Sequence, residues 1–305
     1  MKLKALRVQY GITQHELAKR LETTQQTIAR WESGKSSIPA KHLRDIAVLL
    51  GCSVESLLNA KGDQSPINAK QKNIHRSAAE NSSPYGTVIV DFGGDVAKLR
   101  EWPITCSERI YLLNQMQARV GEGMTSSAQG WIYFETLNDR IVFINTSELE
   151  SLRLISDDAQ EMPEYAHLEI YKAIRQLMYE APLNDENVAS DSYPYTRPFQ
   201  DQCMSLIEQW GGNDDAINRM ECVLVESTKG AQHYLAMEEE GAQDLLFAMQ
   251  GYEGRDLTHQ FANLESEGYH KASFYRFGAL RLIELSNIKW RELIGELNHE
   301  DEQGK

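Results

Sequence analysis

The sequence predicts an α+β multidomain chain, in which a bundle of five short helices precedes a mixed α/β region of small antiparallel sheets or barrels with helices. Helical spacing of apolar residues and a helix-capping pattern predict the bundle, and both lie within roughly the first sixty residues. Short alternating apolar runs predict the sheets after residue 85. With 305 residues, 41% of them hydrophobic, the chain has enough apolar side chains for two or three domains.

The second and third helices of the bundle carry the clearest signals. Thr13 and Glu16 form the Thr-x-x-Glu pattern, in which hydroxyl and carboxylate bond the free backbone N–H groups of a helix start. Thr24 is well suited to cap the next helix after a turn of a few residues. Ile28 and Trp31 provide the buried side of that helix. Its outer side then carries the polar residues Gln25, Gln26, Thr27 and Arg30.

Three further helices complete the bundle. Leu3, Leu6 and Val8 predict a helix in front of the pair, and residues 41–50 and 54–58 add apolar helical faces behind it. Gly34 stands where a C-terminal cap of the third helix is expected.

The segment from Leu3 to Leu58 resembles the Cro/C1-type (XRE) helix-turn-helix family of phage and bacterial repressors. The resemblance is carried by Gly11-Ile12-Thr13-Gln14, Ile28, Trp31-Glu32-x-Gly34, Pro39, Leu43-x-x-Ile46-Ala47-x-x-Leu50-Gly51, Val54 and Leu57-Leu58. The run Thr24-Gln25-Gln26 is similar to the recognition helix of the 434-type repressors in particular. That helix has a further glutamine where this sequence has Arg30, so the same operator is not implied. The resemblance covers about a fifth of the chain and implies a five-helix, lambda-repressor-like domain.

The resemblance implies that the third helix lies in the major groove of DNA with its N-terminal residues toward the bases. Glutamine can bond both N6 and N7 of adenine, and Gln25 is the first choice for such a contact. Gln26 and Thr27 would reach neighbouring base edges, and Arg30 would bond guanine or a phosphate. The full set of candidate DNA-binding residues is Gln14, Thr24, Gln25, Gln26, Thr27, Arg30, Lys35 and Ser36.

Some of these residues are expected to hold the DNA backbone rather than to read bases. Gln14, at the start of the preceding helix, corresponds to the phosphate-clamping glutamine of the family. Lys35, Ser36 and Ser37 follow the third helix and would set the register on DNA. Arg7 and Glu32 correspond to a structural ion pair of the family and are left out of the set.

Ordinary structural roles compete with these functional ones. Adjacent glutamines on a helix are usually only solvated, and Trp31 is expected in the core rather than on DNA. The histidines of the chain lack metal-ligand spacing, and Glu238-Glu239-Glu240 is typical of a solvated turn. The aromatic residues at sheet-like spacing are more often core than the lining of a ligand pocket.

The charge of the chain is divided unevenly. Residues 1–62 contain ten Lys or Arg and five Asp or Glu, a balance of +5, while the whole chain carries −14. The other 243 residues therefore carry −19. A local positive potential is what meets phosphate, so the acidic remainder is expected to serve association, sensing or contact with another protein.

Several classes of protein are disfavoured by the sequence. No run approaches the roughly 20 apolar residues that span a bilayer, and no secretory segment precedes the first helix, so no membrane contact and a cytoplasmic location are expected. Four cysteines at 52, 106, 203 and 222 have neither zinc-site nor disulfide spacing. Metallopeptidase, phosphate-loop and serine-hydrolase signatures are missing, as are the Ala-Gly and Cys-Gly sites of self-cleaving repressors. We therefore expect no enzyme, no cofactor and no metal site.

The chain is expected to fall into a head at 1–60, a flexible linker at 61–84 that lets the head search for DNA independently, and two α+β domains at 85–182 and 183–305. Strands are expected in the alternating segments 87–92, 109–113, 131–137 and 140–144, the last two joined by a turn at Asn138-Asp139. Pro163 is expected to open an amphipathic helix that ends before Pro182.

The second α+β domain either repeats the first or shares only the general look of amphipathic hairpins. Phe274-Tyr275 followed by Arg281–Ser286 matches Tyr133-Phe134 followed by Arg140–Asn145 at an offset of 141 positions. Strands at 221–226 and 233–237 and a helix near 241–249 would complete the second copy. Residues 85–305 resemble no family that we recognise.

These observations favour a sequence-specific DNA-binding transcriptional regulator, more a repressor than an activator, that binds a palindromic operator as a homodimer or higher homo-oligomer. Its C-terminal region would oligomerise or sense an effector ligand or protein partner. One alternative is an antitoxin-like autoregulator whose C-terminal region binds a partner protein. Another is an unrecognised enzyme fused to a DNA-binding head, for which a pocket of convergent polar side chains would be the clue.

Overall fold

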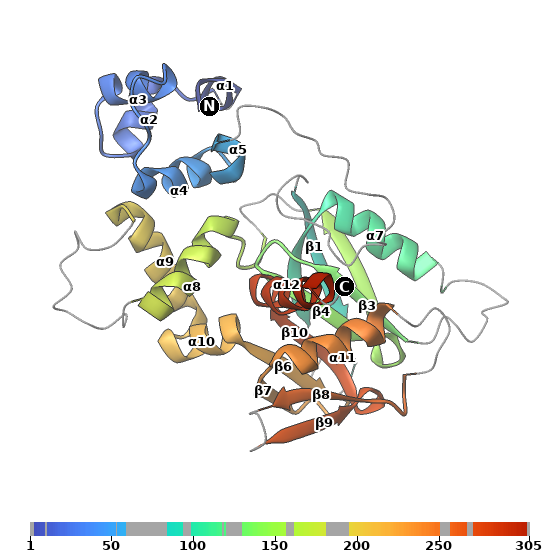
Figure 1. Ribbon diagram of the computed structural model, residues 1–305. Coiled ribbons are helices and arrows are strands. Elements are labelled where there is room, and N and C mark those ends of the chain that lie inside the picture. The colour runs from blue at the N-terminus through green and yellow to red at the C-terminus, as the bar shows by residue number, and fades with distance from the viewer. Residues whose placement is uncertain are drawn as a thin grey trace. The chain divides into compact units, whose positions relative to one another are not determined.

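The computed structural model consists of two compact units (Figure 1). One unit combines Met1–Asn73 with His167–Gly212, and the other combines Ile74–Ala166 with Asn213–Lys305. The structure describes residues 3–9, 11–52, 54–58, 84–93, 99–117, 119, 130–156, 162–180, 195–250, 257–266 and 271–303. The linker expected at 61–84 lies outside the described residues, apart from its last residue, and the division into three domains stays a prediction.

The N-terminal part of the first unit is a bundle of five helices, as the sequence predicts. They are α1 (Leu3–Gln9), α2 (Gln14–Arg20), α3 (Gln25–Glu32), α4 (Ala40–Leu49) and α5 (Val54–Leu58). One apolar core holds them together, and its fully buried side chains include Leu17, Ile28 and Ile46. Val8 of the first helix is 60% exposed and does not belong to this core.

Three helices of the bundle end in the same hydrogen-bonded turn. After α2, α3 and α4 the backbone adopts a left-handed conformation at Glu22, Gly34 and Gly51 (φ +51°, +71° and +54°). The next N–H then bonds the carbonyl five residues back, as from Lys35 to Arg30 at 2.9 Å. Gly34 therefore occupies the predicted cap position. Glu22 is the exception, because a side chain there bears the cost of a left-handed backbone.

Two helices from the middle of the chain complete the first unit. They are α8 (Leu168–Glu180) and α9 (Arg197–Trp210), and they pack against each other, with Tyr171 stacked on Trp210 at 6.2 Å between ring centroids. Residues 163–167 precede α8 as turn and coil, so the helix begins five residues after the predicted start at Pro163. The N-terminal helices thus share a compact unit with helices that the sequence analysis assigned elsewhere.

The second unit is built mostly from antiparallel strands. Its elements are β1 (Pro84–Asp91), β2 (Arg100–Thr105), α7 (Cys106–Gln117), β3 (Trp131–Glu135), β4 (Arg140–Asn145), the 3-10 turn η2 (Thr146–Glu148), β5 (Ser151–Ser156), α10 (Asn213–Glu221), β6 (Cys222–Ser227), β7 (Gln232–Ala236), α11 (Glu239–Gln250), β8 (Phe261–Ser266), β9 (Ala272–Arg276), the 3-10 turn η4 (Phe277–Ala279), β10 (Leu280–Ser286) and α12 (Asn287–Gln303).

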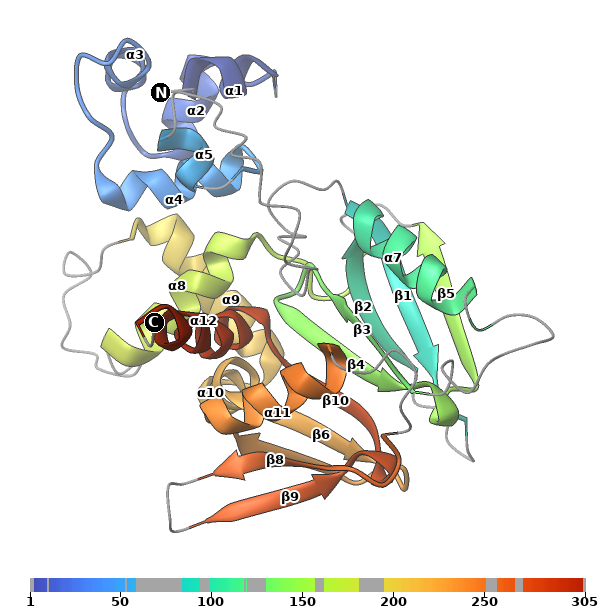
Figure 2. The same cartoon turned by 45° about the vertical axis from the view of Figure 1, so that its right-hand side comes forward.

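The strands form three antiparallel sheets, with the orders β2-β1-β5, β3-β4-β10-β6-β7 and β8-β9 (Figure 2). The five-stranded sheet is central, because both of its faces are apolar. Ile132 and Val142 point into a core shared with β1, β2 and α7, whereas Phe143 and Ile283 point into a second core shared with α11 and α12. The described strands form no closed barrel, so only the small antiparallel sheets of the sequence prediction are present.

The same order of elements occurs twice in this unit. The series strand, strand, helix, strand, strand, 3-10 turn, strand runs from β1 to β5 and again from β6 to β10. The strands at 221–226 and 233–237 and the helix near 241–249 correspond to β6, β7 and α11. The offset of 141 positions, however, matches β4 with β10, which are hydrogen-bonded neighbours and not counterparts in the two series.

One predicted strand is wrong. Residues 109–113 lie in helix α7, because Thr105 caps this helix by accepting a hydrogen bond from the Glu108 N–H at 3.2 Å. Thr105 and Glu108 repeat the Thr-x-x-Glu pattern that begins α2, and this signal outweighs the strand-like apolar run of 109–113. In the part of the chain that the structure describes, no helix is long and apolar enough to cross a membrane.

Candidate nucleic-acid interface

Helix α3 presents a polar face on a rigid base. Ile28 and Trp31 fix the helix in the bundle core, with 0% and 3% of their surfaces exposed. Gln25, Gln26 and Arg30 are exposed on the other side. Gln26 and Arg30 are four residues apart and therefore lie on one side of the helix, one turn from each other. The helix thus presents two amide groups and one guanidinium group to the solvent, where a binding partner could contact them.

Two of the candidate residues build the start of this helix. The Thr24 hydroxyl accepts a hydrogen bond from the Thr27 N–H at 3.1 Å and lies 2.9 Å from the Thr27 hydroxyl. This is the N-cap that the sequence predicts, and it lies beside the exposed glutamines. The N-cap hydroxyl satisfies one backbone N–H of the first turn, so Thr24 and Thr27 orient the helix start.

Gln14 is held by a buried carboxylate. Its side-chain N–H donates to Glu32 Oε2 at 2.6 Å, and Arg7 Nε forms an ion pair with Glu32 Oε1 at 2.5 Å. Burial alone would raise the pKa of Glu32, but the hydrogen bonds from Arg7 and Gln14 lower it below the ordinary value. The amide of Gln14 has a second N–H, which is the one that a phosphate contact would use. Arg7 and Glu32 link α1 to α3, in the structural role expected for them.

Lys35 and Ser36 lie just beyond the C-terminal end of α3. Lys35 is exposed and Ser36 partly exposed, and the left-handed turn at Gly34 directs the chain away from the helix axis. An exposed ammonium group at this position can approach a phosphate without disturbing the base-reading residues. Lys35 therefore remains suited to backbone contact, as the sequence suggested.

Arg44 joins helix α4 to α8 and to the segment that precedes α9. Arg44 lies 3.4 Å from Glu169 Oε2 of α8, donates to Gln176 Oε1 at 3.1 Å and also bonds the Tyr195 hydroxyl. Its guanidinium lies 4.9 Å from the centroid of the Tyr195 ring. Glu169 is 2% exposed, so this ion pair is largely withdrawn from water. Arg44 thus contributes its charge to packing within the unit and is not part of the surface offered by α3.

Asp45, the next residue, makes a second contact of the same kind. Its carboxylate accepts a hydrogen bond from the Thr196 hydroxyl at 2.5 Å, and only 7% of the residue is exposed. Burial raises the pKa of Asp45 from 3.8 to about 6, the Thr196 hydroxyl opposes this, and the charge of Glu22 adds to it. Both views of the molecule show α3 on the side of the bundle away from α8 and α9 (Figures 1 and 2). The two helices therefore leave the polar face of α3 uncovered.

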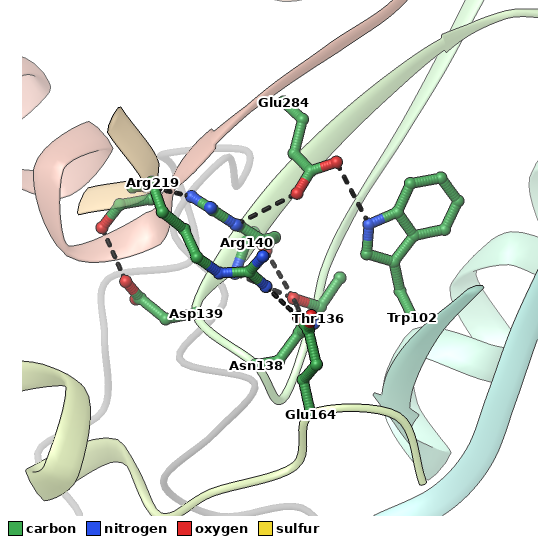
Figure 3. Close-up of polar contacts among 9 residues, drawn as sticks. Trp102, Thr136, Asn138, Asp139, Arg140, Glu164, Arg219 and Glu284 are labelled. Carbon is green, nitrogen blue, oxygen red and sulfur yellow. Dashed lines mark hydrogen bonds and ion pairs between the residues drawn. The ribbon is translucent and has the colours of Figure 1, made fainter. Parts of the chain in front are cut away.

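A second concentration of charged groups surrounds the turn between β3 and β4 (Figure 3). Asp139, at φ +59°, accepts hydrogen bonds from the Ser286 hydroxyl at 2.6 Å and the Ile288 N–H at 3.1 Å. Arg140 Nε lies 3.0 Å from Glu284 Oε1, and the indole N–H of Trp102 donates to the other Glu284 oxygen at 3.3 Å.

Burial dominates the titration of this cluster. It raises the pKa of Asp139 to about 6 and lowers the pKa of Arg140 to about 10. The groups face each other across strands that pair in one sheet, and each of them is engaged by a neighbour. The cluster therefore joins the first series of strands to the second. Among the described residues no group of three or more His, Cys, Asp or Glu side chains could hold a metal ion.

The sequence analysis named the exposed face of α3 but missed Arg44 and Asp45. Their partners Glu169, Gln176, Tyr195 and Thr196 lie more than a hundred residues away, and no spacing pattern connects them. Thr196 before Arg197-Pro198 is the one local signal, because proline favours the first turn of a helix and threonine precedes it at the cap position. This signal marks the start of α9 but not its contact.

Comparison with protein families gives a match to the N-terminal helices. Residues 3–57 match a protein family described as Helix-turn-helix, the Cro/C1 type named from the sequence. No solved structure matches the chain. The match covers α1 to α5 and supports a DNA-binding transcriptional regulator, while it says nothing about α8, α9 or the second unit.

Proposed function

We propose that this chain, whose residues 3–57 form a DNA-binding helix-turn-helix domain, is a sequence-specific transcriptional repressor that binds a palindromic operator as a homodimer. In this proposal α3 enters the major groove, and Gln25, Gln26 and Arg30 contact base edges. Gln14, Lys35 and Ser36 contact the DNA backbone, and Thr24 with Thr27 fixes the start of the reading helix.

The observation that carries this proposal is the exposed amide pair of α3 on a well-packed helical base. Two adjacent glutamines at a helix start can each present a donor and an acceptor, which is the pattern that adenine N6 and N7 require. Residues 1–62 carry a net charge of +5 and the rest of the chain carries −19, so the negatively charged phosphates of DNA are attracted to the N-terminal helices.

We propose a dimer because one small head alone would bind DNA only weakly. A single recognition helix makes few base contacts, whereas two heads related by a dyad engage half-sites about 34–36 Å apart on one face of DNA. The second unit would bring the two heads together, or change their separation when it binds an effector or a protein partner. We propose a cytoplasmic location and no enzymatic activity, cofactor or metal, in line with a role confined to DNA.

Selection of bound fragments from random double-stranded DNA tests this function, with the full chain as bait. The expected result is an enriched motif of two inverted half-sites whose centres lie one helical turn apart. The Gln25→Ala, Gln26→Ala double variant should lose the motif, and Lys41→Ala, an exposed change on α4, should keep it. Fragments without a common motif, or an unchanged motif for the double variant, would contradict the proposal.

A further inference from the structure

The two series of strands provide an internal comparison. We call residues 84–156 the first module and residues 222–286 the second. The turn η2 begins after Asn145 (φ −75°, ψ 112°) and ends at Leu149, and η4 begins after Arg276 (φ −78°, ψ 125°) and ends at Leu280. Asn145 and Arg276 differ by 131 positions, and so do Leu149 and Leu280. Strand β4 therefore corresponds to β9, and β5 to β10, without a gap.

The hairpin of the first module is used twice. One side of it packs on its own module through Ile132 and Phe134, and the other side packs on the second module and on α12, which follows it. There Phe143 is 1% exposed and meets Trp290 at 5.8 Å, and Trp131 meets Phe277 of η4 at 5.7 Å. Strand β4 extends the contact by pairing with β10, where Phe143 lies opposite Ile283 and Val142 opposite Glu284.

The hairpin of the second module makes only the first of these contacts. Ala262 and Leu264 of β8 are buried in their own module. On the opposite side Phe274 is the counterpart of Phe143 and is 63% exposed. Phe261 pairs with Arg276 as Trp131 pairs with Asn145, and it is 60% exposed. Strand β9 pairs with β8 alone, and β5 of the first module pairs with β1 alone, among the strands that the structure describes. One strand edge and one aromatic face are therefore without the partner that the first module's hairpin has.

The register of β4 on β10 predicts how β9 would pair with β5. Adding 131 to each β4 position gives its counterpart in β9, and subtracting 131 from each β10 position gives its counterpart in β5. The transferred register places Phe274 opposite Leu152 and Ser273 opposite Arg153. The next pair is Tyr275 opposite Ser151, and one position beyond it Arg276 lies opposite Glu150, so opposite charges meet just past this end of the ladder. A cavity of about 600 Å³ lies beside β5 and is lined in part by Thr146, Leu149 and Leu152. Thr146 is the counterpart of Phe277, so Phe261 would be directed toward this cavity.

The hairpin of the same chain cannot easily swing over to β5. The carbonyl of Asn263 lies 2.6 Å from the place of a Cβ on Gly241, so β8 approaches α11 more closely than a side chain would allow. The Asn263 N–H also donates to Asp244 at 2.9 Å, and the Phe277 N–H donates to Gln260 at 2.9 Å. These contacts fix β8 and β9 on the second module. The strand that reaches β5 must therefore come from elsewhere.

We infer that β9 of one chain pairs antiparallel with β5 of a second copy of this chain. In the same dimer, β9 of the second copy pairs with β5 of the first. Four modules then form a ring with a two-fold axis, in which each hairpin pairs with the last strand of the next module. The β4·β10 pairing inside one chain is the pattern for the two pairings between chains. The restriction to two copies rests on the proposed function, because a dyad operator requires two heads, whereas the strand pairing itself does not.

Site-directed cross-linking of the full chain in the absence of DNA tests this pairing. Arg153→Cys with Ser273→Cys, made in a Cys106→Ser background to remove an exposed thiol, places one cysteine opposite the other in the predicted register. Mild oxidation should give a covalent dimer of twice the 34.7 kDa chain mass. Each single variant should stay a monomer on a non-reducing gel. Arg153→Cys with Arg276→Cys, three positions out of register, should cross-link poorly.

Light scattering tests the same surface without oxidation. The wild-type chain should have the mass of a dimer, and Phe274→Ser should weaken dimerisation about tenfold or more, because the aromatic ring would lose its apolar burial against the second copy. Tyr234→Ser removes another half-exposed aromatic, on β7, and should leave the dimer unchanged.

Four results would overturn the inference: a monomeric wild type, a disulfide formed within one chain, a dimer cross-linked through Arg153→Cys alone or Ser273→Cys alone, or a trimer or open polymer. None of these results depends on DNA, so a chain that selects an operator but fails these tests would keep the proposed function and lose this interface.

Discussion

Asp45 should make the packing of α4 on α8 and α9 depend on pH. Its carboxyl is buried beside Thr196, and its pKa is raised from 3.8 to about 6. An acid whose pKa is raised in the folded state binds its proton more tightly there than in the unfolded chain. The contribution of Asp45 to the stability of the folded unit is therefore most favourable below pH 3.8 and is lost as the pH rises through about 6.

The size of this effect follows from the pKa values. A shift from 3.8 to about 6 corresponds to about 3 kcal/mol between the protonated and ionised forms. Asp45→Asn removes the ionisation but keeps an oxygen that accepts the Thr196 hydroxyl. At pH 7.5 we expect the variant to stabilise the contact by about 2 kcal/mol, somewhat less than the full amount because the new amide N–H groups need partners. Near pH 4 the two proteins should be equally stable, or the wild type slightly more so.

Hydrogen exchange of α4 and α8 in the full chain is the suitable assay, because it reports local opening in a molecule of two units. Wild type and variant are compared at the same pH, which cancels the intrinsic pH dependence of exchange. The expected gain of about 2 kcal/mol slows exchange about thirtyfold at pH 7.5. Equal or faster exchange in Asp45→Asn at pH 7.5, or a difference that does not change between pH 4 and 7.5, would refute the argument.

Three further predictions concern the first unit and its DNA surface. Arg44→Ala should destabilise the unit by about 1–3 kcal/mol in urea unfolding, because the buried Glu169 is left with the Lys172 cation and Gln176 and Tyr195 lose their arginine partner. Lys41→Ala on the exposed side of α4 should change stability by less than about 0.5 kcal/mol. Glu22→Gly should be more stable than Glu22→Ala by about 0.5–1 kcal/mol, because both variants remove the charge near Asp45 but only glycine relieves the left-handed backbone at φ +51°. Lys35→Ala should weaken binding to all DNA sequences alike and reduce the slope of log K against log salt by about 1, and a sequence-dependent loss would contradict its backbone role.

Local signals in the sequence were sufficient for the N-terminal helices. Thr13 with Glu16, and Thr24 with Thr27, mark helix starts through hydrogen bonds that span three residues, and such bonds need no knowledge of the fold. The exposed face of α3 could be predicted for the same reason, because Ile28 and Trp31 set the buried side by spacing alone.

Contacts between distant segments could not be predicted in this way. Arg44 looks like one more cation of a basic head, and only its packing on Glu169 shows that its charge is used inside the unit. For the same reason the sequence analysis assigned α8 and α9 to the α+β domains and not beside the head.

In the second unit, one strand predicted from residue preferences is a helix, and the repeat offset read from the sequence matches the wrong strands. Residues 109–113 are rich in strand-forming side chains, but the cap at Thr105 makes them helical. The repeat was visible, yet the 141-position match joined two adjacent strands, because strands that pair in one sheet carry similar apolar patterns. The 131-position correspondence became apparent only from the positions of η2 and η4.

The central claim is that Gln25 reads a base, and binding measured across single-base variants of the selected operator tests it most directly. For Gln25→Ala the account predicts that one position per half-site loses its preference, by about 1–3 kcal/mol, while preferences at the other positions persist. The same loss on operator and random DNA, with every preference retained, would contradict it.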